Sequence, residues 1–198
     1  MPLWGATDSD ESKPKNLTTA QKKQVFANAS GWVLEAGSAL SGNDNTDADP
    51  EVLVAIGELS TSIGAADITE VEMVTTTADK SEGFTISVRV RYNEPVDVVT
   101  TGGTPTLAVT NSNAGSGSGR GPHSLSYASG TGTNELIFSL AIAAANAATN
   151  ADDVLTVGAQ NIALNSGTIK DASGTASDAA VAISSAQGTA AGSVTVTA

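Results

Sequence analysis

Short stretches of alternating apolar and polar residues, separated by turn residues, run from about Asp67 to the C-terminus. In residues 84–92 every second side chain is apolar, from Phe84 to Tyr92, and the side chains between them are polar or charged. A period of two directs one set to the buried face of a sheet and the other set to solvent. Because such stretches recur at short spacing, the sequence predicts an all-β sandwich.

The sandwich is expected to use about eight or nine strands, drawn from candidate segments that are each bounded by turn residues. The candidate segments are 68–74, 84–92, 96–99, 106–110, 124–127, 135–142, 155–157, 162–164, 180–184 and 193–197. Aromatic residues make up only 4% of the chain, so aliphatic side chains must fill most of the core. Small side chains suit the thin interior between two packed sheets, with anchors at Phe84, Tyr92, Tyr127 and Phe138.

The first 65 residues have a different pattern. Residues 1–15 read as a polar extended arm, and Thr18 with Gln21 three positions later predicts a helix N-cap, with a short helix to about Phe26. Two buried strands are expected at 31–34 and 52–56, on either side of the acidic loop 41–50. We therefore predict a small N-terminal module over 1–65, which docks on another surface, and a β-sandwich over 66–198.

Charge and composition narrow the function classes. The formal net charge is −12, which opposes nucleic-acid binding, and the absence of cysteine excludes disulfides and thiolate metal sites. The first residues lack the pattern of a signal peptide, and no apolar segment is long enough for a membrane span. We expect neither nucleic acid nor a membrane as a partner.

The candidate catalytic and metal-binding residues favour structural roles. His123, the single histidine, follows Pro122 beside a Gly/Ser-rich loop and is expected to be an exposed strand-entry residue. The acidic loop fails the EF-hand pattern. Calcium at Asp152, Asp153 and Asp171 stays an alternative. We predict no enzymatic activity, no catalytic residue, no cofactor and no resident metal.

Two tryptophans stand out in a chain so poor in aromatic residues. An indole within a polar arm is useful as an interface anchor, which suggests that Trp4 contacts a partner. Trp32 fits either an interface or the core of the small module, and the core is the favoured reading. The candidate partner contacts are Leu3, Trp4, Phe26 and Trp32.

Several blocks of the C-terminal part resemble the immunoglobulin-like and cadherin-like repeats of bacterial surface proteins. They are Tyr-Asn-Glu-Pro-Val-Asp-Val-Val at 92–99, Gly-Thr-Pro-Thr-Leu at 103–107, and the segments 127–138 and 162–171. The resemblance covers residues 68–185 and implies a β-sandwich. It leaves function open, because such sandwiches serve adhesion, spacing and display.

The N-terminal part is similar to structural proteins in tailed phages of marine cyanobacteria. The blocks are Leu-Trp-Gly-Ala-Thr-Asp at 3–8, Ser-Lys-Pro-Lys at 12–15, and the segments 25–27, 31–34 and 51–56. This resemblance implies a capsid decoration protein on the virion surface, assembled in the host cytoplasm, with the major capsid protein or other virion subunits as partners. Self-association remains open. The alternative is a receptor- or carbohydrate-adhesion module of a tail or fibre, with a host-surface glycan as its ligand.

Overall fold

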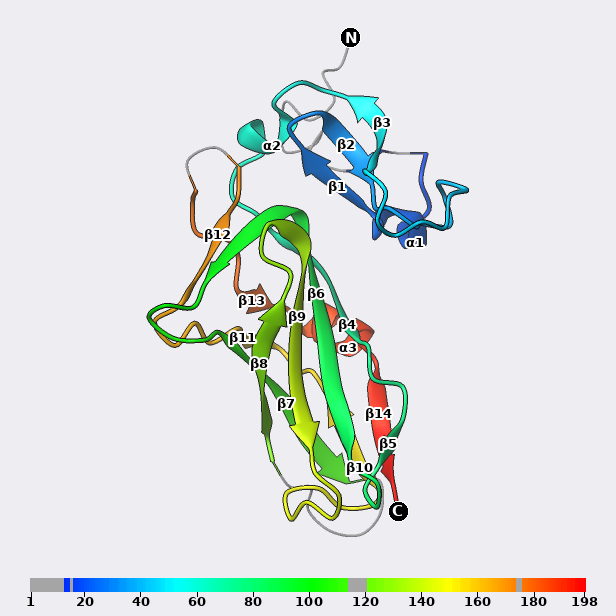
Figure 1. Ribbon diagram of the computed structural model, residues 1–198, viewed down its shortest axis with the longest axis vertical. Coiled ribbons are helices and arrows are strands. Elements are labelled where there is room, and N and C mark those ends of the chain that lie inside the picture. Colours follow the sequence, from blue (N-terminus) through cyan, green and yellow to red (C-terminus); the bar gives the residue numbers. More distant parts are fainter. Residues whose placement is uncertain (1–12, 15, 114–120, 174–175) are drawn as a thin grey trace.

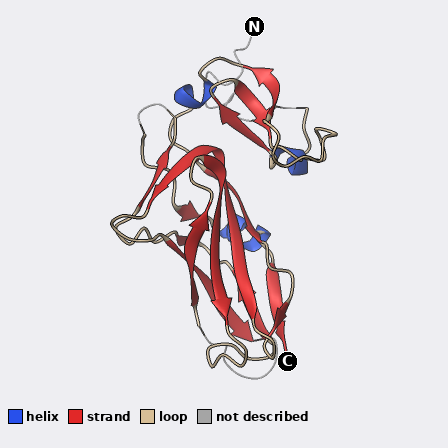
Figure 2. Cartoon of the chain, in the orientation of Figure 1, coloured by secondary structure: helices blue, strands red, loops and turns tan. Residues whose placement is uncertain are grey.

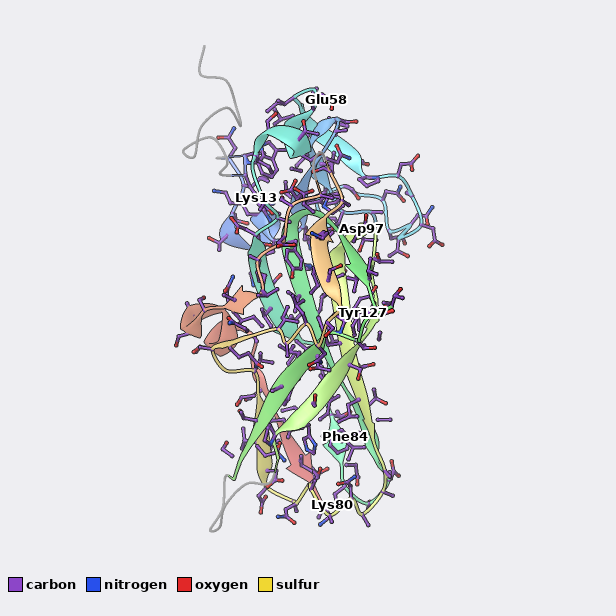
Figure 3. All side chains as sticks on the ribbon, turned by 90° about the vertical axis from the view of Figure 1, so that its left-hand side faces the viewer. Lys13, Glu58, Lys80, Phe84, Asp97 and Tyr127 are labelled. Carbon is purple, nitrogen blue, oxygen red and sulfur yellow. The ribbon has the colours of Figure 1, made fainter. Side chains whose placement is uncertain are left out.

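Strands dominate the computed structural model, which describes residues 13–14, 16–113, 121–173 and 176–198 (Figure 2). A small N-terminal module and a larger curled β-sheet follow one another along the long axis of the molecule (Figure 1). Glu58 lies at the outer end of the module and Lys80 lies at the opposite end of the molecule (Figure 3). The prediction of a mainly β fold with a sandwich in the C-terminal part is confirmed.

The N-terminal module is a three-stranded antiparallel sheet with two one-turn helices. Its elements are α1 (Thr19–Lys22), β1 (Val25–Asn28), β2 (Gly31–Leu34), β3 (Glu51–Ala55) and α2 (Leu59–Ser62), and the strand order is β1-β2-β3. The predicted capping box is present, since Thr18 Oγ1 accepts from the Gln21 amide and Gln21 Oε1 accepts from the Thr18 amide. The helix ends at Lys22 rather than Phe26, because Val25 and Phe26 pair with β2 instead.

The larger module contains nine strands in one curled sheet, a two-stranded ribbon and one short helix. These elements are β4 (Ile68–Met73), β5 (Ala78–Asp79), β6 (Phe84–Val99), β7 (Thr106–Asn113), β8 (His123–Ser129), β9 (Thr133–Ile142), β10 (Asp153–Thr156), β11 (Gln160–Asn161), β12 (Thr168–Asp171), β13 (Ala182–Ile183), α3 (Ser185–Ala190) and β14 (Ser193–Thr197). The sheet order is β12-β6-β9-β8-β7-β10-β14-β5, and β4 also pairs with β6. The sheet folds over itself, so that two layers enclose the core (Figure 1).

The strand β6 differs from its prediction in length. We expected separate strands at 84–92 and 96–99, but one strand of 16 residues continues through Pro95. The register with β9 shifts between Arg91 and Val96, so Pro95, which has no amide proton to donate, falls where the ladder is interrupted. On its other side, β6 pairs with β4 before this point and with β12 after it.

The sandwich core follows the predicted alternation. Ile86, Val88, Val90 and Tyr92 on β6 are fully buried, and the residues between them are partly exposed. Tyr127 meets Phe138 edge to face, with ring centroids 6.1 Å apart. A second cluster fills the N-terminal module around Val25, Ala27, Trp32, Leu34, Leu59 and Ile63. The two clusters divide between Ile63 and Ala66.

The alternation of β6 predicts unequal costs for two truncations on one strand. Ile86→Ala should lower the free energy of unfolding by about 2–5 kcal/mol, because it opens a cavity in a fully buried site. Val99→Ala is the matched control, since Val99 is 50% exposed, and it should change stability by less than about 0.5 kcal/mol. Urea unfolding followed by circular dichroism measures both. Equal losses would contradict the burial pattern.

Candidate functional site

The junction between the two modules is built on one face of the N-terminal sheet. Phe26 and Val33 are paired across β1 and β2, and they lie on the face opposite to the Trp32 core. Both are buried, and β1 packs against β6. A cleft of about 660 Å³ lies at this junction, between Phe26 and Glu35 on one side and Arg89, Arg91 and Asn134 on the other.

Arg91 occupies the centre of a charged network that joins the modules. Its guanidinium is 3.4 Å from Glu35 of the N-terminal module and 2.7 Å from Glu70 on β4, and it also pairs with Glu135 on β9. Glu35 accepts a hydrogen bond from Asn134 Nδ2 at 2.9 Å. Three carboxylates from three segments therefore converge on one cation.

Further ion pairs surround this centre. Lys23, directly after α1, binds Glu70, so this carboxylate links both modules. Arg89 pairs with Glu72 at 2.5 Å and lies 3.5 Å from Glu135. These pairs follow from the register, since β4 places Glu70 opposite Arg91 and Glu72 opposite Arg89.

Burial and neighbouring charge move the pKa values in opposite directions. Burial raises the pKa of Glu35, although Arg91 opposes the shift. Burial also acts to raise the pKa of Glu70, but the hydrogen bonds from Lys23 and Arg91 lower it more. A lowered folded-state pKa means that Glu70 stabilises the fold above the usual carboxyl range and loses this effect as the pH falls.

Lys13 approaches the same network from the N-terminal side. Its ammonium donates to the carbonyl oxygen of Lys22 at 2.6 Å. Burial lowers its pKa to about 8, although Glu35 acts in the opposite direction. The junction therefore holds several charged groups that solvent reaches only in part.

The strand β3 presents an open edge at the outer part of the N-terminal module. Within the described residues it is hydrogen-bonded to β2 alone, and Val52 and Leu53 are 51% and 38% exposed. A register shift places Val54 opposite Trp32 and Val52 opposite Val33, so that Leu53 is an extra residue without a cross-strand partner. An open edge with apolar side chains is a template for pairing with another chain.

Acidic residues precede, begin and follow β3 along the chain, and together they are called the acidic rim. Residues 36–64 carry five acidic residues and no lysine or arginine; they are Asp44, Asp47, Asp49, Glu51 and Glu58, and all five are exposed. In the loop 41–50, Asn43 and Asn45 side chains accept from the amides two residues on, at 3.0 Å each. These Asx turns account for the asparagines of the loop without a bound ion.

Of the four predicted partner contacts, Trp32 and Phe26 lie within the described residues, in two different environments. The Trp32 side chain is fully buried in the module's own core, so we revise the interface reading for it and keep the core reading. Phe26 is 7% exposed and faces the sandwich, so its contact is within the chain. Leu3 and Trp4 lie outside the described residues, and their role remains a prediction.

His123 is buried rather than exposed at a loop, which corrects the expectation for it. Its Nε2 lies 3.2 Å from Thr149 Oγ1 and 3.2 Å from Asn111 Nδ2. Burial lowers its pKa, although Asp153 acts in the opposite direction. Thr149 and Asp153 are also fully buried, so the group forms a closed polar cluster at the end of the sandwich.

The aspartates of the calcium alternative do not form one site. Asp153 begins β10 near the outer end of the sandwich, whereas Asp171 ends β12 near the N-terminal module (Figure 1). Asp153 Oδ2 accepts from the Asn150 amide and from Asn111, and Asp171 Oδ1 accepts from Ser173. Within the described ranges, no group of three or more acidic, histidine or cysteine side chains is arranged to hold a metal ion.

Comparison of the chain with family models, with curated proteins and with solved structures finds no match. None of the helices in the described part of the chain is long and apolar enough to cross a membrane.

The Arg91 network makes a testable prediction about the junction. Arg91→Met should destabilise the N-terminal module by about 3–5 kcal/mol, because Glu35, Glu70 and Glu135 then face one another without their central cation. Arg89→Met is the control; its partner Glu72 is 41% exposed, and a loss of about 1 kcal/mol or less is expected. Both tryptophans precede residue 66, so urea unfolding followed by tryptophan fluorescence in a Trp4→Phe background reports on this module. Equal losses in the two variants would refute the central role of Arg91.

Proposed function

We propose that the chain is a non-enzymatic structural protein of a phage virion surface. In this proposal the N-terminal module attaches to the capsid, and the sandwich is displayed toward solvent. The edge of β3 is the observation that carries the proposal, because among the described residues its outer backbone groups have no partner strand and its apolar side chains are half-exposed. The resemblance of the N-terminal blocks to phage structural proteins supports the same role.

Strand addition is the binding mode that we propose for attachment. A strand from a capsid subunit would continue the order β1-β2-β3, with its backbone satisfying the outer edge of β3 and its side chains covering Val52 and Leu53. The acidic rim favours a strand that carries lysine or arginine beside apolar residues. The arm with Leu3 and Trp4 would add further apolar contacts.

The arrangement of the modules agrees with attachment at one end. The C-terminus and Lys80 lie at the end of the molecule remote from the N-terminal module (Figures 1 and 3). A chain held through β3 would therefore extend the sandwich away from the surface to which it binds.

Copy number and position on the particle test this proposal directly. Gold-labelled antibody and quantitative mass spectrometry on purified virions should find the chain in many copies over the capsid shell. A few copies confined to the tail would favour the adhesion alternative instead. Absence of the chain from purified virions would overturn both readings.

A single substitution tests the role of the β3 edge. Leu53→Lys should weaken binding to capsids that lack the chain by about 10-fold or more, because it removes an apolar contact of about 1.5–3 kcal/mol and repels a basic strand. Val99→Lys places the same charge at a half-exposed site on the sandwich and should bind like the parent chain. Cosedimentation measures both, and circular dichroism checks the fold. Parental binding by Leu53→Lys would remove β3 from the interface.

A further inference from the structure

A buried carboxyl group lies where the inward face of β6 reaches the N-terminal module. Glu94 follows Tyr92 and precedes Val96 in the buried alternation of β6, and it is 0% exposed. One of its oxygens, Oε1, has no hydrogen-bond partner within the described part of the chain. An ionised carboxylate in such a position is costly, and a protonated one is much less so.

A single hydroxyl group connects Glu94 with both modules. Ser173 Oγ lies 3.1 Å from Glu94 Oε2, 2.6 Å from Asp171 Oδ1 and 2.8 Å from the carbonyl oxygen of Ser60 in α2. Three acceptors thus surround a group that has only one proton to donate. If Glu94 carries a proton, it can donate to Ser173 Oγ, and Ser173 can then donate to Asp171 or to Ser60.

The charges around this group are acidic. Burial is the largest cause that raises the pKa of Glu94, and the charges of Asp171 on β12 and Asp67 before β4 raise it further. The hydrogen bond with Ser173 acts in the opposite direction. The combined effect is a pKa of about 8. Lys170, the neighbour of Asp171, pairs with Asp178 at 2.8 Å, and α2 contributes no charged residue.

We propose that Glu94, Ser173 and Ser60 form a proton-operated latch between the sandwich and the N-terminal module. When Glu94 is protonated, the hydrogen bonds through Ser173 hold α2 against the end of β12. When Glu94 loses its proton, two carboxylates share one buried site, and the contact with α2 is released. Clefts of about 330 Å³ and 270 Å³ adjoin Ser60 and Ser173, and they give solvent a route to the latch.

The sign of the pH dependence follows from the raised pKa. The folded chain holds a proton on Glu94 that the unfolded chain releases near the usual carboxyl value. The stabilising effect of the latch is therefore complete at acidic pH and is lost as the pH rises through about 8. Glu70 contributes with the opposite sign, because its lowered pKa makes its stabilising effect disappear as the pH falls. A single curve of stability against pH would therefore mix the two effects, and substitutions of each residue are needed to distinguish them.

Difference infrared spectroscopy tests the proton itself. Spectra of the full chain minus those of Glu94→Gln should show a protonated carboxyl band at neutral pH, which disappears with a midpoint near 8. If this difference spectrum shows no protonated carboxyl band at neutral pH, Glu94 is ionised in the folded chain and the proposal is wrong.

Spin-label distances test the latch. The chain has no cysteine, so Ser62→Cys on α2 and Ser129→Cys on β8, both exposed, place two labels without background. With a chelator present to remove calcium ions, the distribution of distances between the two labels should broaden as the pH rises through about 8. In the Glu94→Gln variant it should stay narrow. In the Ser173→Ala variant the distance distribution should be broad at every pH, because the substitution removes the hydroxyl that connects the two modules.

The same spin-label distance measurement is applied to a control variant. Glu72→Gln removes a carboxyl that is 41% exposed at the same junction, and it should respond to pH as the parent chain does. A pH-independent distribution in the parent chain would overturn the latch. Narrowing by calcium ions at alkaline pH would also overturn it, because a cation and not a proton would then close the site.

Discussion

The alternation of β6 is the constraint on which both modules depend. Its inward side chains run from Ile86 to Val96 and form the centre of the sandwich core. Its outward side chains include Arg89 and Arg91, which hold the carboxylates of β4, β9 and the N-terminal module. One strand therefore fixes the core with one face and the junction with the other. A shift of one residue would place arginines in the core and valines at the junction.

The excess of acidic over basic residues makes the stability of the junction depend on a few cationic side chains. The chain carries 21 acidic and 9 basic residues, and four of the basic ones, Lys13, Lys23, Arg89 and Arg91, lie at the junction. Exposed pairs contribute little, but Arg91 and Glu70 are only 11% and 10% exposed. Removing one partner from such a group leaves the others uncompensated. The junction is thus held by electrostatics that are sensitive to substitution and to pH.

The sequence predicted local patterns well and contacts between distant segments poorly. The alternation from Phe84 to Tyr92 and the capping box at Thr18 were sufficient, because both depend on residues a few positions apart. Extending the same alternation by one step would have placed Glu94 in the core, so this signal was present in the sequence. The pairing of Arg91 with Glu35 joins residues 56 positions apart, and the buried position of His123 depends on Thr149 and Asn111. No local pattern contains these contacts.

The edges of the two modules differ in how they are protected. At one end of the large sheet the last strand, β5, has only two residues, and at the other end β4 and β12 together cover the free side of β6. By contrast, β3 has five residues, one side without a partner strand among the described residues, and two half-exposed apolar side chains. Such an edge would also pair with a second copy of itself. The acidic rim opposes that outcome, because two copies bring like charges together at the edge, whereas a basic strand brings opposite charges. In the attachment mode proposed above, these charges would therefore favour a basic strand over a second copy of β3.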